Sequence, residues 1–356
     1  MITTEATSDP RTVLELAPEL LDHRIPANVV LPLLRKQVER LVTQPDSSDV
    51  SRPPPTHTST TRWYLLFTQE NSPANHRRLD LLAAVTSNRI GEYPLFIFCP
   101  HDELAVTYQF LEPRIRRLVE AMYSDSLLSR RRVFAVFARA DLARAFATSW
   151  STRSGIATVA KPYYSAVLAT ASRSSIDVAA RPCQSDDISS LCRAAELTDI
   201  AEAAEFCKAF ADDSIIYSMT SDAARIEAEG YIRDRSLYVC EIETGGVRRI
   251  ASIVAVTRNA HPYAFVTKVF TAPEYRGKGI VQRLVRWTCD HYFTALGYEY
   301  VSLYVDLANI PAARAYKNVG FYPIRLSTND DDSGADVMEE WLEIGFDVAE
   351  TDIGSW

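Results

Sequence analysis

The chain has 356 residues, of which 47% are hydrophobic and 24% are charged, and its formal net charge is −8. This composition excludes global disorder, and the length indicates about two domains. The most apolar stretch, residues 93–99, is too short for a membrane span, and the N-terminus lacks the basic flank and apolar core of a signal peptide. We therefore predict a cytoplasmic protein with no membrane partner. The acidic balance also argues against a nucleic-acid partner.

The cysteines and histidines give no sign of a metal site. Six of each are scattered along the chain, without the paired spacing typical of metal ligands. We expect reduced, mostly buried thiols, as in an intracellular protein, and no bound metal.

The first half of the chain alternates between strand-like and helical patterns. Residues 1–42 are expected to be helical, because their apolar side chains recur at helical spacing. The Pro-, Ser- and Thr-rich segment 43–62 is predicted to be a flexible insertion. Strand-like runs at 63–68, 94–99 and 133–137 enclose helical patterns at 105–122 and 142–150. Such alternation favours an α/β layer structure.

The second half begins afresh near residue 174. We expect a strand at 176–182, helices through residue 233, and then strands at 237–243, 249–257, 264–271 and 300–305. Helices are expected at 279–296 and 311–319, with a terminal hairpin around the acidic loop 329–336, whose tip is interpreted as solvated. The predicted domains are therefore 1–173, which includes the insertion at 43–62, and 174–356. Ten of the twelve glycines follow Gly155, so a close backbone approach to a ligand is expected in the second domain.

Residues 269–281 have the pattern of an anion-binding turn between a strand and a helix. Gly277 and Gly279 carry no Cβ atom, so their backbone N–H groups can turn toward phosphate oxygens. The helix that follows adds unpaired N–H groups and the positive end of its dipole. Arg276 and Lys278 supply positive charge. The alternative is an ordinary glycine-containing turn with solvated basic residues.

A second block, residues 306–321, has the pattern of a capped helix that projects one phenol. Asn309 stands at the expected N-cap, and Pro311 is acceptable in the first turn. Ala312 and Tyr316 follow on one side of the helix, where the small alanine leaves room beside the tyrosine. The alternative is a capped helix with a single core tyrosine.

Together the two blocks resemble the GNAT superfamily of acyl-CoA-dependent N-acyltransferases. The family loop Arg/Gln-x-x-Gly-x-Gly/Ala is matched by Arg276, Gly279 and, imperfectly, Val281. The family motif Asn-x-x-Ala-x-x-x-Tyr-x-x-x-Gly-Phe is matched in full by Asn309, Ala312, Tyr316, Gly320 and Phe321. The resemblance covers residues 176–346. It is greatest to a branch in which an active C-terminal domain follows a degenerate one, with a weaker match at residues 137–150.

The resemblance implies an α/β (α+β) fold of tandem GNAT-like domains, each a mixed, mostly antiparallel twisted sheet flanked by helices. It implies transfer of an acetyl group from acetyl-CoA to the amine of a small molecule by direct attack. Strands 264–271 and 300–306 would diverge to admit the pantetheine arm. The implied CoA-binding residues are Val269, Phe270, Thr271, Arg276, Gly277, Lys278, Gly279, Ile280, Val281, Asn309, Ala312 and Tyr316.

The resemblance also implies that Tyr316 is the general acid, and a phenol with its ordinary pKa near ~10 is protonated at neutral pH. The sequence does not decide whether the general base is Asp306, Glu241, Glu243 or a relay of water molecules. Each of these carboxylates can also be interpreted as a surface or capping group. Lys268 points either into the acceptor site or outward. His261 and His291 are interpreted as surface or packing residues, and the Arg130–Arg132 cluster as surface.

Two other functions stay open: a non-catalytic acyl-CoA-binding module, and a GNAT fold with altered chemistry such as O-acylation or decarboxylation. The acceptor and the oligomeric state are not specified by the sequence. Between residues 63 and 172 the only glycines are Gly91 and Gly155, and neither is followed by a second glycine two residues later. We therefore predict that the first domain is degenerate and that one CoA binds per chain.

Overall fold

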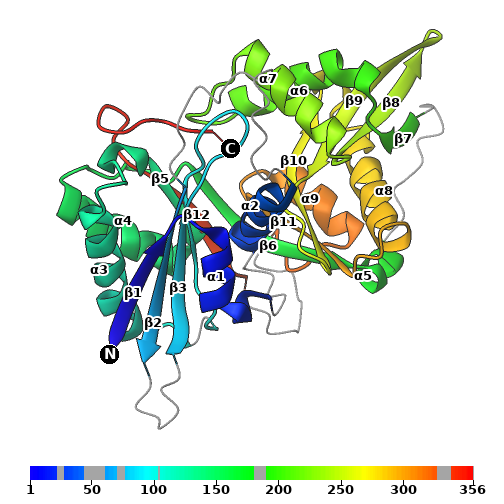
Figure 1. Cartoon of the computed structure of the whole chain (residues 1–356). Helices are drawn as coiled ribbons and strands as arrows, with labels where there is room; N and C mark the ends of the chain where they lie inside the picture. The colour runs from blue at the N-terminus through cyan, green and yellow to red at the C-terminus, as the bar shows by residue number, and fades with distance from the viewer. Residues whose placement is uncertain are drawn as a thin grey trace. The chain divides into compact units, whose positions relative to one another are not determined.

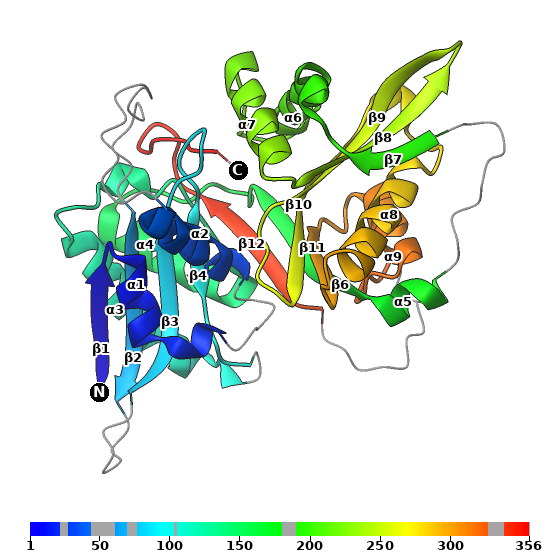
Figure 2. The same ribbon diagram turned by 45° about the vertical axis from the view of Figure 1, so that its right-hand side comes forward.

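The computed structural model describes residues 1–21, 28–43, 61–69, 77–102, 105–179, 190–326 and 338–355. Two compact units are present: one comprises Met1–Tyr164 with Trp341–Trp356, and the other comprises Ser165–Glu340 (Figure 1). Each unit contains a mostly antiparallel sheet flanked by helices (Figure 2). This confirms the predicted α/β class and the mixed, mostly antiparallel sheets.

In the first unit the strands lie in the order β1-β2-β3-β4-β5-β12. Among the described strands of this unit, only β4 and β5 pair in parallel. The strands are β1 (Ile2–Thr7), β2 (Arg62–Gln69), β3 (Arg77–Val85), β4 (Leu95–Phe98), β5 (Ala135–Arg139) and β12 (Glu340–Gly345). The helices are α1 (Pro10–Leu16), α2 (Leu31–Thr43), α3 (Tyr108–Ser124) and α4 (Ala140–Ser154).

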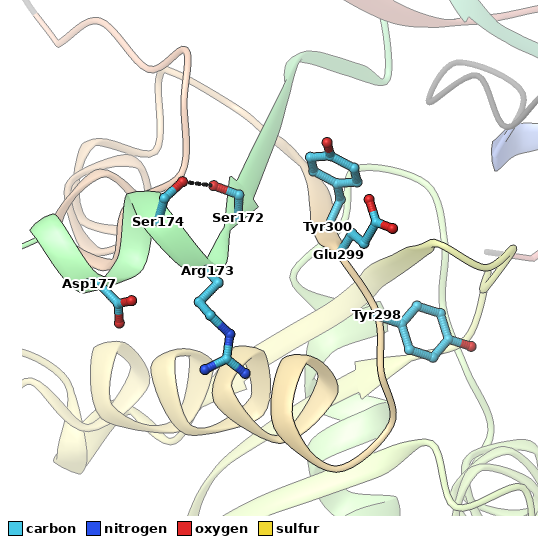
Figure 3. A pocket seen from close by; sticks show the side chains of 7 residues that line it. All are labelled: Ser172, Arg173, Ser174, Asp177, Tyr298, Glu299 and Tyr300. Atoms are coloured by element: carbon cyan, nitrogen blue, oxygen red, sulfur yellow. Dashed lines mark hydrogen bonds between the residues drawn. The ribbon is translucent and has the colours of Figure 1, made fainter.

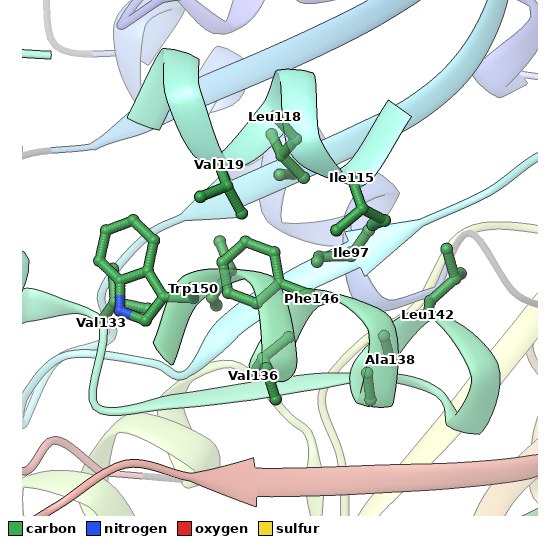
Figure 4. Packing of buried hydrophobic residues seen from close by; sticks show 14 of the residues in the cluster. Ile97, Ile115, Leu118, Val119, Val133, Val136, Ala138, Leu142, Phe146 and Trp150 are labelled. Atoms are coloured by element: carbon green, nitrogen blue, oxygen red, sulfur yellow. The ribbon is translucent and has the colours of Figure 1, made fainter. Parts of the chain in front are cut away.

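The core of this unit lies between the sheet and helices α3 and α4. Leu118 of α3 and Phe146 and Trp150 of α4 are fully buried (Figure 4). The Phe146 and Trp150 rings stack with their centroids 5.9 Å apart, because residues four apart share one helix face. Helix α4 ends at Gly155, whose left-handed conformation (φ 78°) stops the helix.

In the second unit the strand order is β6-β11-β10-β9-β8-β7, and within its described residues only β10 and β11 pair in parallel. The strands are β6 (Tyr164–Ser172), β7 (Ser190–Ala194), β8 (Leu237–Thr244), β9 (Val247–Val256), β10 (Tyr263–Thr271) and β11 (Tyr300–Val305). The helices are α5 (Arg173–Val178), α6 (Ile200–Asp212), α7 (Ser221–Arg233), α8 (Ile280–Thr294) and α9 (Ile310–Val319). Helices α6 and α7 lie on one side of the sheet, and α8 and α9 on the other (Figure 2).

The unit boundaries differ from the predicted domains 1–173 and 174–356. Strand β6 pairs with β11, so residues 165–172 belong to the second unit. Strand β12 was expected in a terminal hairpin, but it pairs with β5. Its Trp341 is 2% exposed, and its ring centroid lies 5.3 Å from that of Phe137. Burial of this aromatic pair ties the last residues of the chain to the first unit.

Several local predictions also need correction. Residues 2–7 form β1 rather than helix, and β3, β6 and β7 were not predicted as strands. The predicted strand 176–182 begins instead within α5, where the Ser172 hydroxyl accepts a hydrogen bond from the Ser175 N–H at 3.2 Å and starts the helix. Most of the predicted insertion 43–62 and the whole of loop 329–336 lie outside the described residues.

None of the helices that the structure describes is long and apolar enough to cross a membrane. Within the same residues, no group of three or more His, Cys, Asp or Glu side chains is arranged to hold a metal ion.

Candidate active site

The two parallel strands of the second unit pair over only part of their length. Their register runs from Tyr263↔Tyr300 to Val266↔Leu303 and then stops, while β10 continues to Thr271. A bulge in the pairing of β10 with β9 lies between Val266 and Lys268. The strands therefore diverge, as expected, and the end of β10 keeps only β9 as a sheet neighbour. The predicted arm-binding residues, Val269, Phe270 and Thr271, all lie in this diverging segment.

The turn after β10 has the backbone that an anion-binding loop requires. Gly277 (φ 76°) and Gly279 (φ 71°) are both left-handed, a conformation that strains residues with a Cβ atom. A Cβ added at either glycine would meet no atom of the described chain within 4 Å, so both positions face open space. Gly279 is the N-cap of α8, and no side chain caps the helix there. No side chain of the described residues accepts from the first N–H groups of α8, which are therefore available to bind an anion.

The two cations of this turn occupy different positions. The Arg276 side chain folds back onto the end of β10, where its Nε donates to the Thr271 carbonyl at 3.0 Å. Its guanidinium carbon lies 5.3 Å from the centre of the Phe270 ring. The Lys278 Nζ lies 5.4 Å from the centre of the Tyr275 ring. Arg276 thus braces the turn as well as adding charge, while Lys278 stays exposed beside it.

Ile280 and Val281 begin helix α8 with their side chains toward the core. Ile280 is 2% exposed, and the half-buried Val281 packs against the same hydrophobic cluster. The bulky side chain that departs from the family pattern is therefore directed inward. The Val281 amide remains in the first turn of the helix.

Asn309 and Tyr316 lie on the second element of the predicted site. The Asn309 Oδ1 accepts from the Ala312 N–H at 3.2 Å, so Asn309 is the N-cap of α9. Tyr316 is 8% exposed, and its ring packs edge-on against Phe321 with centroids 5.9 Å apart. Within the described residues its hydroxyl makes no hydrogen bond. Burial raises the pKa of Tyr316, so the phenol keeps its proton.

The candidate general bases all have structural partners. The Asp306 Oδ1 accepts from the Ala308 N–H at 2.7 Å and shapes the turn before α9. Glu241 pairs with Arg193. Glu243 pairs with Arg248 at 3.2 Å on the surface.

The two histidines of this unit occupy structural positions. The His261 Nε2 lies 3.2 Å from the Gly297 carbonyl oxygen. The His291 ring stacks on Trp287 with centroids 5.3 Å apart. His261 is exposed, as expected of a loop residue, and the contact of His291 agrees with its interpretation as a packing residue.

One buried charged pair near the site was not predicted. Lys268 of β10 and Glu227 of α7 are each 4% exposed, and the Lys268 Nζ lies 2.5 Å from the Glu227 Oε2. The Tyr231 hydroxyl donates to Glu227 Oε1 at 2.8 Å, and the Phe210 ring centre lies 4.9 Å from Nζ. Lys268 therefore points toward α6 and α7, not outward. The sequence feature that could have indicated this pair is that Lys268 and Glu227 each interrupt a pattern of apolar residues.

A hollow of about 460 Å³ lies elsewhere in the second unit (Figure 3). Its lining includes Ser172, Arg173, Glu299 and Tyr300. Tyr300 is the first residue of β11, whereas Asp306 and helix α9 follow the other end of that strand. The hollow therefore contains none of the predicted CoA-binding residues.

Comparison with known proteins agrees with this geometry. Residues 201–321 match the model of the acetyltransferase (GNAT) family. The chain is 31% identical over 87 residues to spermidine N(1)-acetyltransferase of Escherichia coli K12, a match that covers 24% of this chain and 44% of that protein. It thus spans less than half the length of this relative.

Solved structures extend the likeness to the whole chain. A Drosophila protein superposes with a TM-score of 0.54 at 13% identity, covering 96% of this chain and 98% of that one. A tandem GNAT protein from the clavulanic acid biosynthesis pathway gives a TM-score of 0.50 at 11% identity, covering 97% and 98% of the two chains. Residues 201–321 are therefore a domain of the GNAT acetyltransferase family, in a chain that has the tandem GNAT fold.

Proposed function

We propose that the protein is an N-acetyltransferase that moves an acetyl group from acetyl-CoA to the amine of a small molecule. The observation that carries this proposal is the divergence of β10 from β11 beside the uncapped N-terminus of α8. Backbone groups of Val269, Phe270 and Thr271 would hold the pantetheine arm. Residues 276–281 would hold the diphosphate, and the open space beside Gly277 and Gly279 fits such a group.

The chain supplies proton transfer and orientation, and acetyl-CoA supplies the activated thioester. Attack by a neutral amine requires that the acceptor lose a proton and that the departing thiolate gain one. Tyr316 is the proposed general acid, because its phenol is protonated and without a hydrogen-bond partner in the described chain. Asp306 is the proposed base. One of its oxygens binds the Ala308 N–H, which holds the carboxylate at the end of β11.

The acceptor is proposed to be a small cationic amine. Residues 199–235, which include α6 and α7, carry nine acidic side chains against four basic ones. Such a balance raises the local concentration of cations. Lys268, on β10, points toward these same two helices, so they cover the face of the sheet next to the diverging segment. The bacterial relative is named for the acetylation of spermidine, which supports the same class of acceptor.

One CoA is proposed to bind per chain, in the second unit. In the first unit β4 and β5 also pair in parallel over two residues only. There the Arg139 side chain, 6% exposed, extends from the end of β5 and donates to the His101 carbonyl at 3.3 Å. Asp141 holds the guanidinium through two hydrogen bonds of 2.9 Å. Helix α3 is capped by the Thr107 hydroxyl, which occupies the Phe110 N–H at 3.2 Å.

The test is to incubate the full chain with radiolabelled acetyl-CoA and a panel of amines, with product mass spectrometry. Transfer of label to a primary amine, with release of free CoA, is the expected result. CoA binding without transfer to any acceptor would indicate a non-catalytic acyl-CoA-binding module. An ester product or release of carbon dioxide from malonyl-CoA would indicate altered chemistry. Absence of CoA binding would refute the proposal.

A further inference from the structure

Two cysteines that are far apart in the sequence lie directly opposite each other in the sheet of the second unit. Cys192 of β7 and Cys240 of β8 are register partners in an antiparallel pair. Directly opposed residues of antiparallel strands have Cα atoms about 4.5–5.5 Å apart, and a disulfide needs about 4.4–6.8 Å. The backbone is therefore already placed for a bond between the two sulfur atoms. Both residues are free thiols in this structure.

The two thiols differ in access to solvent. Cys240 is fully buried in the core under α8, whereas Cys192 is half-buried. Strand β7 is the edge strand of the sheet within this unit, since β8 is its one neighbour in the strand order. Cys192 is therefore the more accessible of the two residues to a soluble oxidant.

The surroundings favour reaction of the buried thiol once Cys192 has been modified. Arg283 of α8 donates to the Ser190 hydroxyl of β7, which brings its positive charge toward both cysteines. Once Cys192 is in a mixed disulfide it has no S–H to donate, so the groups that still favour the Cys240 thiolate are the Ser190 hydroxyl and the Arg283 charge. The thiolate is the form that attacks a disulfide. The Arg283 charge favours it at both cysteines, but the neighbouring Cys240 side chain and burial raise the pKa of Cys192, so the first step should be the slower one.

We propose that Cys192 and Cys240 form an ordered thiol–disulfide site that closes by exchange with a small disulfide such as oxidised glutathione. In the first step the Cys192 sulfur attacks the glutathione disulfide, forms a mixed disulfide and releases one glutathione thiolate. In the second step the Cys240 sulfur attacks the Cys192 sulfur and releases the second glutathione. The two protein thiols are oxidised to one disulfide, and one oxidised glutathione is reduced to two thiols that take up the two protons.

This proposal is independent of the proposed acetyl transfer, because neither cysteine belongs to the predicted CoA-binding set. The new bond would tie the edge strand β7 to β8 and close a loop of chain that includes α6 and α7. Closing such a loop restricts the unfolded chain more than the folded one. The oxidised protein should therefore melt several degrees above the reduced protein.

The test uses the full chain, fully reduced, freed of reductant and then treated with oxidised glutathione under native conditions. Mass spectrometry of the digest should show one cross-link, between the peptides of Cys192 and Cys240. Cys240→Ala should keep one stable glutathione on Cys192, and Cys192→Ser should take up none at Cys240. Cys289→Ala, at another buried cysteine of the same unit, is the matched control and should form the cross-link as the wild type does.

The order of the two steps is what makes the proposal refutable. A wild-type protein that keeps glutathione on Cys192 without closing the bond would overturn it. A bridge from either cysteine to Cys183, or a glutathione adduct on Cys240 in Cys192→Ser, would also overturn it. The thermal shift on oxidation should be present in Cys289→Ala and absent in Cys192→Ser. An equal shift in all variants would show that it does not arise from this disulfide.

Discussion

Replacing Lys268 by methionine should destabilise the second unit strongly, because it removes one charge of a buried pair and leaves the other. The Lys268 and Glu227 side chains are 3% and 5% exposed, so water cannot solvate the carboxylate that remains. Only the Tyr231 hydroxyl would still donate to it among the contacts described above. Breaking a buried ion pair from one side costs about 3–5 kcal/mol. For a unit of this size that corresponds to a fall in Tm of roughly 10 °C.

A double variant separates the cost of the lone charge from the net value of the pair. Replacing both charges with apolar groups is often close to neutral, so Lys268→Met with Glu227→Leu should recover most of the loss. The remaining cost is that of the hydrogen bond from the Tyr231 hydroxyl to Glu227, which the double variant loses, about 1–3 kcal/mol. Arg233→Met is the control, since its i,i+4 pair with Glu229 is exposed and such pairs contribute about 0.5 kcal/mol or less.

The assay is urea unfolding followed by circular dichroism and tryptophan fluorescence, analysed with separate transitions for the two units if they appear. A loss below about 1 kcal/mol in Lys268→Met, with no recovery in the double variant, would refute the reasoning. Such a result would mean that solvent reaches the pair in solution.

The other predictions concern the proposed site. Tyr316→Phe should keep the fold and the CoA affinity but lower kcat by roughly 10²–10⁴-fold. Because burial raises the pKa of the phenol, kcat of the wild type should not fall through loss of this proton below about pH 10. A variant with the turnover of the wild type would show that Tyr316 is a packing residue. Gly279→Trp and Arg276→Glu should both weaken CoA binding in calorimetry. The tryptophan would fill the open space beside the turn, and the glutamate would reverse the charge at position 276. Unchanged affinity in both variants would refute the assignment of the loop. Asp306→Asn keeps an oxygen that can accept the Ala308 N–H, so the variant should keep its Tm and lose kcat through loss of the base. An unchanged kcat would show that Asp306 only shapes the turn. Calorimetric titration of the intact chain with CoA should give a stoichiometry near one, and a second site of similar affinity would contradict the closed geometry around Arg139.

The parts of the fold that follow from local pattern were predictable from the sequence. Helix α8 begins after Gly279 and presents a buried apolar face, so periodicity specifies it, while α9 is specified by periodicity together with its N-cap, Asn309. Strand β6 was missed because alanine, which is depleted in strands, recurs along it. The pairing of β12 with β5 depends on a contact between residues some two hundred positions apart, which local pattern does not encode.

Some features of the candidate site could likewise be predicted from the sequence, and others could not. The left-handed glycines and the position of Tyr316 could be read from spacing alone, because the motif residues are close in the sequence. The direction of the Lys268 side chain could not, since a bulge at the preceding residue sets which face of β10 it occupies. The Cys192–Cys240 pair was hidden for a similar reason, since sheet register rather than spacing along the chain places the two residues opposite each other.

Both units contain a pair of parallel strands that part after a few residues, and the side chains next to the divergence account for the proposed difference in CoA binding. In the second unit β10 and β11 separate before a turn that has two left-handed glycines and leads to an uncapped helix. In the first unit β4 and β5 separate in the same way, but Arg139 bridges from the end of β5 to the His101 carbonyl and Thr107 caps the next helix. The strand arrangement alone therefore does not create an anion site. Backbone N–H groups that no side chain occupies, and space that no side chain crosses, are the features that separate the two units.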